Sequence, residues 1–363
     1  MALRFNCNML LIARQARRLS QLELADSTGI NQGVLSRIEN GLREPTEDVV
    51  NQLCKKLRFP QGFFYQSGRV YGLPVSVHAR KKCNVGIHQL DYIVAELNIR
   101  LWNLKKLLQS IELIPPELPL PYLDIDDYGG DIDKIADLVR RCWLLPRGPI
   151  ENLTECLERA GCVVFWCDFD NIAVDGVTIA AFQDMPICIF LNKDRPADRM
   201  RFTLAHELAH IVMHKLPHPE MEEQADRFAS ALLMPYHDIR EQFEMIGNKI
   251  TLPKLAYLKP IWRVSMQALL IRAKNTGVIS KIQSEYLWKQ INIAKIRLHE
   301  PPELDFPHEE PTTLKTILNL HIEKLGYSIS ELAEAVCLHE SEFCEKYHIN
   351  KNPPPRRHLR VLS

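Results

Sequence analysis

The sequence has no excess of charge of either sign, since 45 lysine and arginine residues balance 45 aspartate and glutamate residues. This balance excludes a protein that binds nucleic acid over its whole surface, so any such binding must come from a local patch. Its ten cysteines include no CxxC pair and show no regular spacing. We therefore expect free thiols in a reducing cytosol, and neither a disulfide scaffold nor a zinc ribbon.

The sequence also lacks long apolar runs. No stretch has the length that a membrane-spanning helix needs, and the N-terminal region lacks the apolar core and cleavage site of a signal peptide. We expect a soluble, cytoplasmic protein with no membrane partner. The hydrophobic content of 46% supports packed cores, and a length of 363 residues predicts two or three domains.

The most informative segment is His206-Glu207-Leu208-Ala209-His210, which lies in an apolar stretch that reads as a helix. Residues four apart share one face of a helix, so His206 and His210 can hold one metal ion from the same side. Glu207 lies on an adjacent face, close enough to take a proton from a metal-bound water. This pattern is typical of zinc hydrolases, although the bare motif also occurs by chance in many helices.

The residues after this motif strengthen the prediction of a metal site. Pro217 and Pro219 end the first helix, and a second helix then carries Glu222 and Asp226. Two antiparallel helices can bring Glu222 to the metal as a third ligand, while Asp226 accepts a hydrogen bond from a ligand histidine. The competing interpretation is a buried helix pair with solvated charges.

Three other residues compete with Glu222 for the third ligand position. Glu223 is rotated by about 100° from Glu222 on a helix, and only Glu222 shares a face with Asp226. His214 and His218 are also alternatives, although we interpret both as rim or substrate-facing residues. Two histidines and one carboxylate suit Zn²⁺, with Mn²⁺ or Fe²⁺ as alternatives.

The segments 201–210 and 222–235 together resemble the ImmA/IrrE family of gluzincin-like metallopeptidases, with weaker similarity from residue 138 to residue 310. Proteases of this family are associated with the cleavage of repressors in mobile elements and in DNA-damage responses. The resemblance implies that His206, His210 and Glu222 bind the metal and that Glu207 is the general base. It also implies a zincin-like fold.

Residues 6–66 are dense in short helices. We expect an amphipathic helix over 8–18, a second over 21–28 capped by Ser20, and a third over 32–40 that ends at Gly41. Gly29 supplies the turn between the second and third helices. A helix, a turn with glycine and another helix form the helix-turn-helix pattern of DNA-binding proteins.

The stretch 19–41 resembles an XRE-type (Cro/repressor) domain, with 36–41 as its most specific element. Amide and hydroxyl groups read base edges, whereas arginine pairs with guanine or phosphate. We interpret Arg14 and Glu39 as a structural ion pair. The alternative to a DNA-binding domain is a small helical module that docks proteins and has lost DNA binding. Family geometry implies two sets of DNA contacts: Gln32, Gly33, Ser36 and Arg37 in the major groove, and Gln21 and Asn40 at phosphates or bases.

A long helix from about 88 to 111 follows a linker whose basic cluster at 80–82 either touches phosphate or is solvated. Its apolar residues repeat at four-three spacing, which fits either a coiled-coil homodimer or packing against its own chain. The repeat consists of Leu90, Val94, Leu97, Leu101, Leu104, Leu108 and Ile111.

Strands are expected at 162–166, 177–180 and 187–191, as a small antiparallel sheet before the metal-binding helix. The segment 177–182 could hold a peptide substrate by strand addition. Arg201, Tyr236, His237 and Tyr257 are candidates to stabilise an oxyanion, although Arg201 could equally be the structural partner of a carboxylate. We interpret 264–273 as a packing element, with a second nucleic-acid contact as its alternative.

The predicted fold class is α+β and mostly α. An all-α helix-turn-helix domain (1–66) and a linker with a long amphipathic helix (67–121) precede a zincin-like metallopeptidase core (122–245). A helical extension (246–300) follows, and then a linker, a small helical element and a basic tail (301–363).

These features predict a DNA-binding transcriptional regulator with a metal-dependent endopeptidase domain. Its expected partners are a double-stranded DNA operator and a repressor or antitoxin-like protein substrate, in a stress, phage or mobile-element response. The alternative is a regulator, antitoxin-like within a toxin–antitoxin operon, whose peptidase-like domain senses or docks with little catalysis. Glu207 argues against this alternative, because a domain that only binds metal has no chemical need for a base.

Overall fold

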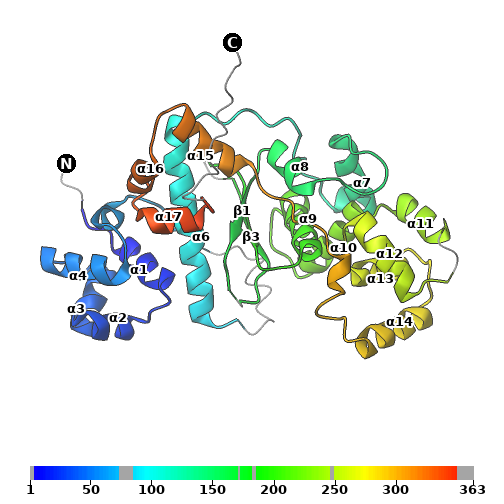
Figure 1. Ribbon diagram of the computed structural model, residues 1–363, viewed down its shortest axis with the longest axis horizontal. Coiled ribbons are helices and arrows are strands. Elements are labelled where there is room, and N and C mark those ends of the chain that lie inside the picture. The colour runs from blue at the N-terminus through cyan, green and yellow to red at the C-terminus, as the bar shows by residue number, and fades with distance from the viewer. Residues whose placement is uncertain (1–3, 73–84, 171, 182–184, 246–248, 350–363) are drawn as a thin grey trace, which may run out of the picture. The chain divides into compact units, whose positions relative to one another are not determined.

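The computed structural model describes residues 4–72, 85–170, 172–181, 185–245 and 249–349 (Figure 1). The chain divides into two compact units, which are described one at a time. Among the described residues, unit 1 comprises 4–72, 85–113 and 315–349, and unit 2 comprises those from 114 to 314. The basic cluster at 80–82 and the basic tail expected from the sequence lie outside the described residues. No described helix is long and apolar enough to cross a membrane.

The N-terminal part of unit 1 has the expected short helices, and side chains cap the starts of the first three. Ser20 forms a capping box with Glu23, and Asn31 accepts a hydrogen bond from the Gly33 N–H. Gly29 has a φ of 73°, the left-handed conformation that a tight interhelical turn requires. The helices are α1 (Cys7–Ala16), α2 (Gln21–Thr28), α3 (Gln32–Glu39), α4 (Glu47–Leu57) and the 3₁₀ turn η1 (Gln61–Tyr65).

The long helix α6 (Ile87–Leu107), followed by the 3₁₀ turn η3 (Leu108–Ser110), is buried within its own chain. Leu97, Leu101 and Leu104 of the four-three repeat are at most 3% exposed, and α6 packs against α1. This burial favours packing within the chain over a coiled-coil seam, because the central apolar positions are already covered.

Three C-terminal helices complete unit 1, although about 200 residues separate them from α6 in the sequence. They are α15 (Thr313–Glu323), α16 (Ile329–Ala335) and α17 (Glu340–Lys346). Lys346 Nζ lies 2.7 Å from the Glu96 carboxylate, and the Tyr347 hydroxyl accepts a hydrogen bond of 2.8 Å from the Asn103 amide. Unit 1 is therefore discontinuous in sequence, with unit 2 inserted between its parts.

Unit 2 contains a three-stranded mixed sheet, so the expectation of an antiparallel sheet was wrong. The strands are β1 (Val163–Cys167), β2 (Gly176–Ile179) and β3 (Cys188–Asn192), in the order β1-β3-β2. β3 pairs in parallel with β1 and antiparallel with β2. The central strand β3 is buried at every position, and β1 at all but one, which is the pattern of strands covered on both faces.

Helices α8 and α9, defined below, pack against this sheet, and further helices build most of unit 2. α9 packs against β2, β3 and α8, and α10 packs against α9 and α7. Segment 214–220, with its two prolines, separates α9 from α10 as the sequence predicts. The elements are η4 (Asp126–Tyr128), α7 (Ile132–Cys142), α8 (Leu153–Arg159), α9 (Ala197–Met213), α10 (Met221–Leu233), α11 (Tyr236–Met245), α12 (Leu252–Trp262), α13 (Met266–Asn275), α14 (Lys281–Ile293) and η5 (Pro302–Leu304).

The segment 300–311, which the sequence predicts to be a linker, makes side-chain contacts with several elements of unit 2. The Glu300 carboxylate accepts hydrogen bonds from Lys259 of α12 and from the first N–H of α13. The Glu309 carboxylate accepts from the N–H groups of Leu153 and Thr154 at the start of α8. This segment therefore caps two helices rather than merely joining them.

Candidate metal centre

Helices α9 and α10 bring His206, His210 and Glu222 together, with one potential ligand atom of each within 4.8 Å of the others. The two Nε2 atoms are 3.1 Å apart, and the Glu222 carboxylate oxygens lie 3.5 Å from His206 Nε2 and 3.4 Å from His210 Nε2. Two atoms bound tetrahedrally to Zn²⁺ at 2.0–2.1 Å lie about 3.3–3.4 Å apart. The three donors therefore fit one tetrahedral ion with a fourth position left for water.

The contact between His206 and Asp226 fixes the tautomer of the His206 imidazole in the form that can bind a metal. His206 Nδ1 lies 2.7 Å from Asp226 Oδ1, one turn after Glu222 on α10. Since a carboxylate only accepts hydrogen bonds, Nδ1 carries the proton and Nε2 presents its lone pair to the ligand group. The residue expected to support a ligand histidine thus lies where that role requires.

His214 stands in the same relation to His210, a role that the sequence reasoning missed. Its Nδ1 lies 2.9 Å from His210 Nδ1, and its Nε2 lies 3.1 Å from Gln224 Oε1. Burial, with a further contribution from His210, lowers the pKa of His214 to about 4, so its ring is neutral. Its Nε2–H donates to Gln224 and its Nδ1 accepts from His210 Nδ1–H, which leaves His210 Nε2 unprotonated for metal.

The competing third ligands lie outside the ligand group in the described structure. Glu223 is exposed, whereas Glu222 is half-buried. The ring of His218 packs edge-on against the ring of His214, with the two ring centroids 5.3 Å apart. His214 contacts Nδ1 of His210, the ring nitrogen that points away from the ligand group. The i, i+4 spacing from His210 to His214, together with Gln224 on the next helix, was the sequence signal for the supporting role.

Glu207 is 1% exposed and lies beside the edge strand of the sheet. The Thr178 hydroxyl of β2 donates a hydrogen bond of 2.8 Å to Glu207 Oε2. Sequence reasoning did not single out Thr178, because a threonine in an apolar strand gives no local signal of this long-range contact. The bond orients the carboxylate and connects it directly to β2.

Of the oxyanion candidates, Arg201 has the structural role. Its buried guanidinium contacts the Glu309 carboxylate and the Ile150 carbonyl. The Tyr236 hydroxyl accepts a hydrogen bond of 2.7 Å from Arg240, and Tyr257 is 62% exposed. Neither tyrosine, nor His237, has a described contact with the ligand group.

The expected DNA contacts lie on α2 and α3 of unit 1. Gln32, Gly33, Arg37 and Asn40 are exposed and Ser36 is half-buried, as a recognition surface requires. Gln21 differs, because its amide donates to Glu39 Oε2 at 2.8 Å. Glu39 also pairs with Arg14 at 2.6 Å, and both side chains are at most 12% exposed, which confirms that ion pair as structural.

Two known protein families match separate parts of the chain. Residues 10–60 match the family described as helix-turn-helix, and residues 157–274 match the peptidase M78 family, described as IrrE N-terminal-like domain. The resemblances to XRE-type and ImmA/IrrE-type domains are thereby confirmed.

Two curated relatives also match part of this chain. They are uncharacterised HTH-type transcriptional regulators from Mycobacterium tuberculosis, strains CDC 1551 and H37Rv, each 36% identical over 52 residues. The match covers 14% of this chain and 37% of each relative, so the chain spans little more than a third of their length.

Proposed function

We propose that this chain, in which an XRE-type helix-turn-helix region precedes a peptidase M78-type domain, is a DNA-binding regulator that hydrolyses a protein partner. One observation carries the enzymatic part of the proposal. The three donors of His206, His210 and Glu222 converge, while Asp226 and His214 each hold one histidine with Nε2 unprotonated. A buried pair of helices with merely solvated charges has no reason to satisfy all of these contacts at once.

Each residue of the site has a defined task in peptide hydrolysis. A bound Zn²⁺, or Mn²⁺ in its place, would supply a polarised water and a positive charge for the carbonyl oxygen. Glu207 takes the proton of the attacking water and delivers it to the leaving amine. Thr178 holds the Glu207 carboxylate in place, while Asp226 and His214 keep the two imidazoles in the metal-binding tautomer.

The outer edge of β2 is the proposed docking site for the substrate backbone. β2 is a terminal strand of the sheet, and Thr178 connects it directly to Glu207. An extended segment that adds to this edge would place its backbone beside the base. The substrate is proposed to be a repressor or antitoxin-like protein, in a stress, phage or mobile-element response in the cytoplasm.

DNA binding is proposed to use the exposed start of α3. Gln32, Ser36 and Arg37 would read base edges in the major groove of an operator, with Gly33 allowing close approach. Asn40 would contact the adjoining phosphate. Gln21 would also contact phosphate, once its side-chain amide has given up its hydrogen bond to Glu39. Two copies of the chain would be needed to read two half-sites.

The alternative function is a transcriptional regulator, antitoxin-like, whose peptidase-type domain binds a signal or a partner without turnover. The buried Glu207 argues against it, because its hydrogen bond from Thr178 positions a base that a sensor does not use.

The deciding experiment is elemental analysis of purified wild type, Glu222→Ala and Glu207→Gln. We expect about one metal per chain in wild type and in Glu207→Gln, because Glu207 is not a ligand, and much less in Glu222→Ala. Wild type that holds no metal even after addition of Zn²⁺ or Mn²⁺ would overturn the enzymatic proposal and leave the alternative.

A further inference from the structure

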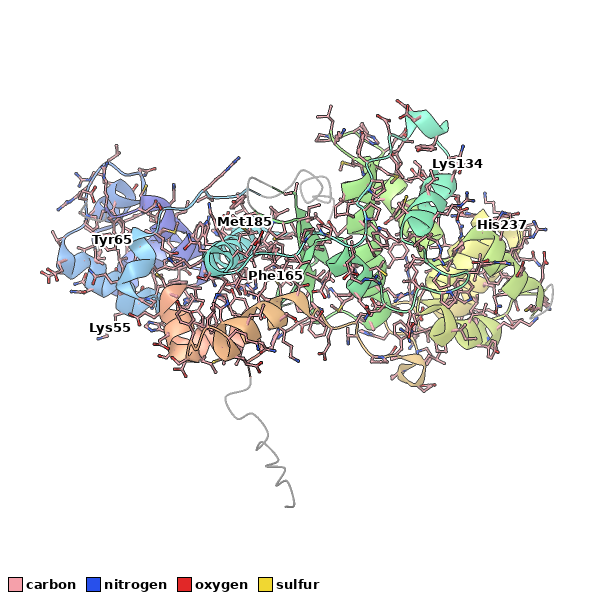
Figure 2. All side chains as sticks on the ribbon, turned by 90° about the horizontal axis from the view of Figure 1, so that it is seen from above. Lys55, Tyr65, Lys134, Phe165, Met185 and His237 are labelled. Atoms are coloured by element: carbon pink, nitrogen blue, oxygen red, sulfur yellow. The ribbon has the colours of Figure 1, made fainter. Side chains whose placement is uncertain are left out.

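Helix α14 of unit 2 carries three apolar side chains along one exposed face. Ile282 is 79% exposed, Tyr286 59% and Ile293 81%. Since successive residues are about 100° apart around a helix, Ile293 lies within about 20° of Ile282, and Tyr286 within about 40°. In Figure 2 the labels of Lys134 and His237 mark the helical part of unit 2, to which α14 in Figure 1 belongs. Single exposed apolar side chains are common, whereas an apolar stripe is typical of an interaction surface.

The opposite face of the same helix attaches α14 to the rest of unit 2. Ser284, Leu287 and Ile291 are at most 3% exposed, and α14 packs against α12 and α13. Ser280 forms a capping box with Gln283, so the start of the helix is fixed. The exposed stripe is therefore a preformed surface, because rotation of α14 to cover it would expose the buried face.

The structure offers no free apolar seam on α6, the helix that the sequence suggested for a homodimer. The central leucines of its four-three repeat are covered within unit 1. The helix α14 begins at Lys281, beyond the segment 157–274 that matches the peptidase family. That family match therefore does not account for the exposed stripe.

The stripe has nearly the same pattern of residues from either end. In two α14 helices related by a two-fold axis through the middle of the helix, Ile282 of each copy would face Ile293 of the other. Tyr286 of each copy would face Lys289, which places an ammonium group on each tyrosine ring. The Gln290 amide donates a hydrogen bond of 3.1 Å to the Tyr286 hydroxyl, which holds the ring in position.

The charges of the stripe favour this antiparallel arrangement over a parallel one. A parallel pair in the same register would set Lys289 of one copy directly against Lys289 of the other, and like charges opposite each other are unfavourable. The antiparallel pair instead gives each lysine an aromatic partner. The formal net charge of the chain is zero, so two copies have no overall repulsion to overcome.

We propose that this chain forms a homodimer through α14, in which the exposed stripes of two copies pack antiparallel. A helix of 13 residues is about 20 Å long, so the stripe buries less than the roughly 800 Å² per partner of a stable interface. We therefore expect a weak dimer, with a dissociation constant of about 1–100 µM.

A weak dimer of this kind forms most readily where two chains are already held close together, as on two half-sites of one operator. This consequence rests on the proposed DNA binding. The self-association itself goes beyond the proposed function and depends neither on DNA nor on peptide hydrolysis.

Sedimentation equilibrium of the full chain without DNA, over a range of concentrations, tests the proposal. The single variants Ile282→Glu and Ile293→Lys should each dimerise at least about tenfold more weakly than wild type, because each sets a charge against an isoleucine. The double variant Ile282→Glu/Ile293→Lys should dimerise more tightly than either, because the antiparallel pair sets a carboxylate against an ammonium at both ends. Leu144→Glu, at an exposed apolar position of unit 2 outside α14, is the matched control and should dimerise as wild type does.

Wild type that stays monomeric up to about 1 mM would overturn the proposal, as would single variants that dimerise as tightly as the control. If monomeric wild type bound a protein substrate through α14, the stripe would belong to that substrate and not to a second copy. A double variant that dimerises no more tightly than the single variants would overturn the antiparallel arrangement. A chain that dimerises but binds no operator would contradict the proposed DNA binding alone.

Discussion

At the scale of single residues, the two imidazoles of the proposed metal site depend on supports of different kinds. Asp226 holds His206 through a charged carboxylate, whereas His214 holds His210 through a neutral ring that Gln224 orients. Both supports set the same tautomer by hydrogen-bonding Nδ1. The motif His206–His210 contains neither Asp226 nor His214, so its spacing predicts two ligands and the base but not the residues that orient those ligands.

Replacing Asp226 by alanine is expected to weaken metal binding by about 10–100-fold, because His206 loses the partner that fixes its tautomer. Competition titration with a zinc-binding dye would measure the change. Glu223→Ala is the matched control, since Glu223 is exposed on the same helix and lies outside the ligand group. Equal metal affinity in the two variants would contradict a supporting role for Asp226.

At the scale of secondary-structure elements, α3 carries the exposed residues proposed to contact DNA. The ion pair between Arg14 and Glu39 fixes the C-terminal end of this helix. Arg37→Ala should lower operator affinity by about 1–3 kcal/mol, because arginine contacts to bases or phosphates are lost. Fluorescence anisotropy on an operator selected by the wild type would measure it. Arg43→Ala, an exposed arginine beyond α3, is a control for general charge. Equal losses in both variants would argue against a specific role for α3.

The contact between Glu309 and α9 shows how a single side chain joins elements of unit 2. Glu309 meets the buried guanidinium of Arg201 and caps α8 through Leu153 and Thr154. Glu309→Ala is expected to lower the free energy of unfolding by about 3 kcal/mol, because it leaves a buried charge uncompensated. Chemical denaturation would measure the loss, with exposed Glu310→Ala as control. If Glu309→Ala lowered the free energy of unfolding no more than the control does, the buried Arg201 would not need a carboxylate partner.

At the scale of the whole molecule, unit 1 assembles from both ends of the chain and unit 2 is inserted between them. Buried charges of α6 depend on the C-terminal part. Glu96 and Arg100 are at most 5% exposed on their side chains, and Lys346 of α17 completes the cluster at 8%. A chain without α17 would leave this cluster short of one positive charge, so we expect the helix-turn-helix region to lose stability together with the C-terminal helices.

The acid stability of unit 1 provides a test of this cluster. Burial raises the pKa of Glu96, but the charges of Lys346 and Arg100 outweigh burial and bring the pKa down to about 2. This lies below the unfolded value of about 4.3, so the stabilisation is present above that pH and disappears as the pH falls toward 2.

Replacing Lys346 by methionine should therefore reduce unit 1 stability near neutral pH and make the remaining stability less dependent on pH between about 4.5 and 2. Thermal unfolding followed by circular dichroism across this range would measure both effects. Lys105→Met, at an exposed position of α6, is the control. Parallel pH profiles for wild type and Lys346→Met would contradict a role for Lys346 in holding Glu96 ionised.

The sequence by itself determined those features that depend on neighbours along one helix or turn. The spacing of His206 and His210, the capping of α2 by Ser20 and the turn at Gly29 follow from helix periodicity and backbone sterics, which act over a few residues. The helix-turn-helix region and the mostly α architecture were predictable on these grounds, and the preference for Glu222 over Glu223 as a metal ligand rests on the same helix periodicity.

Only the tertiary structure decided which distant segments meet. Three contacts join residues that no local sequence pattern connects. They are the parallel pairing of β1 with β3, the hydrogen bond from Thr178 to Glu207, and the ion pair between α6 and α17. The same holds for the four-three repeat of α6, which fits a partner chain or its own chain equally well. Packing resolves such choices because buried apolar area and buried charge must be satisfied in three dimensions, wherever the partners lie in the sequence.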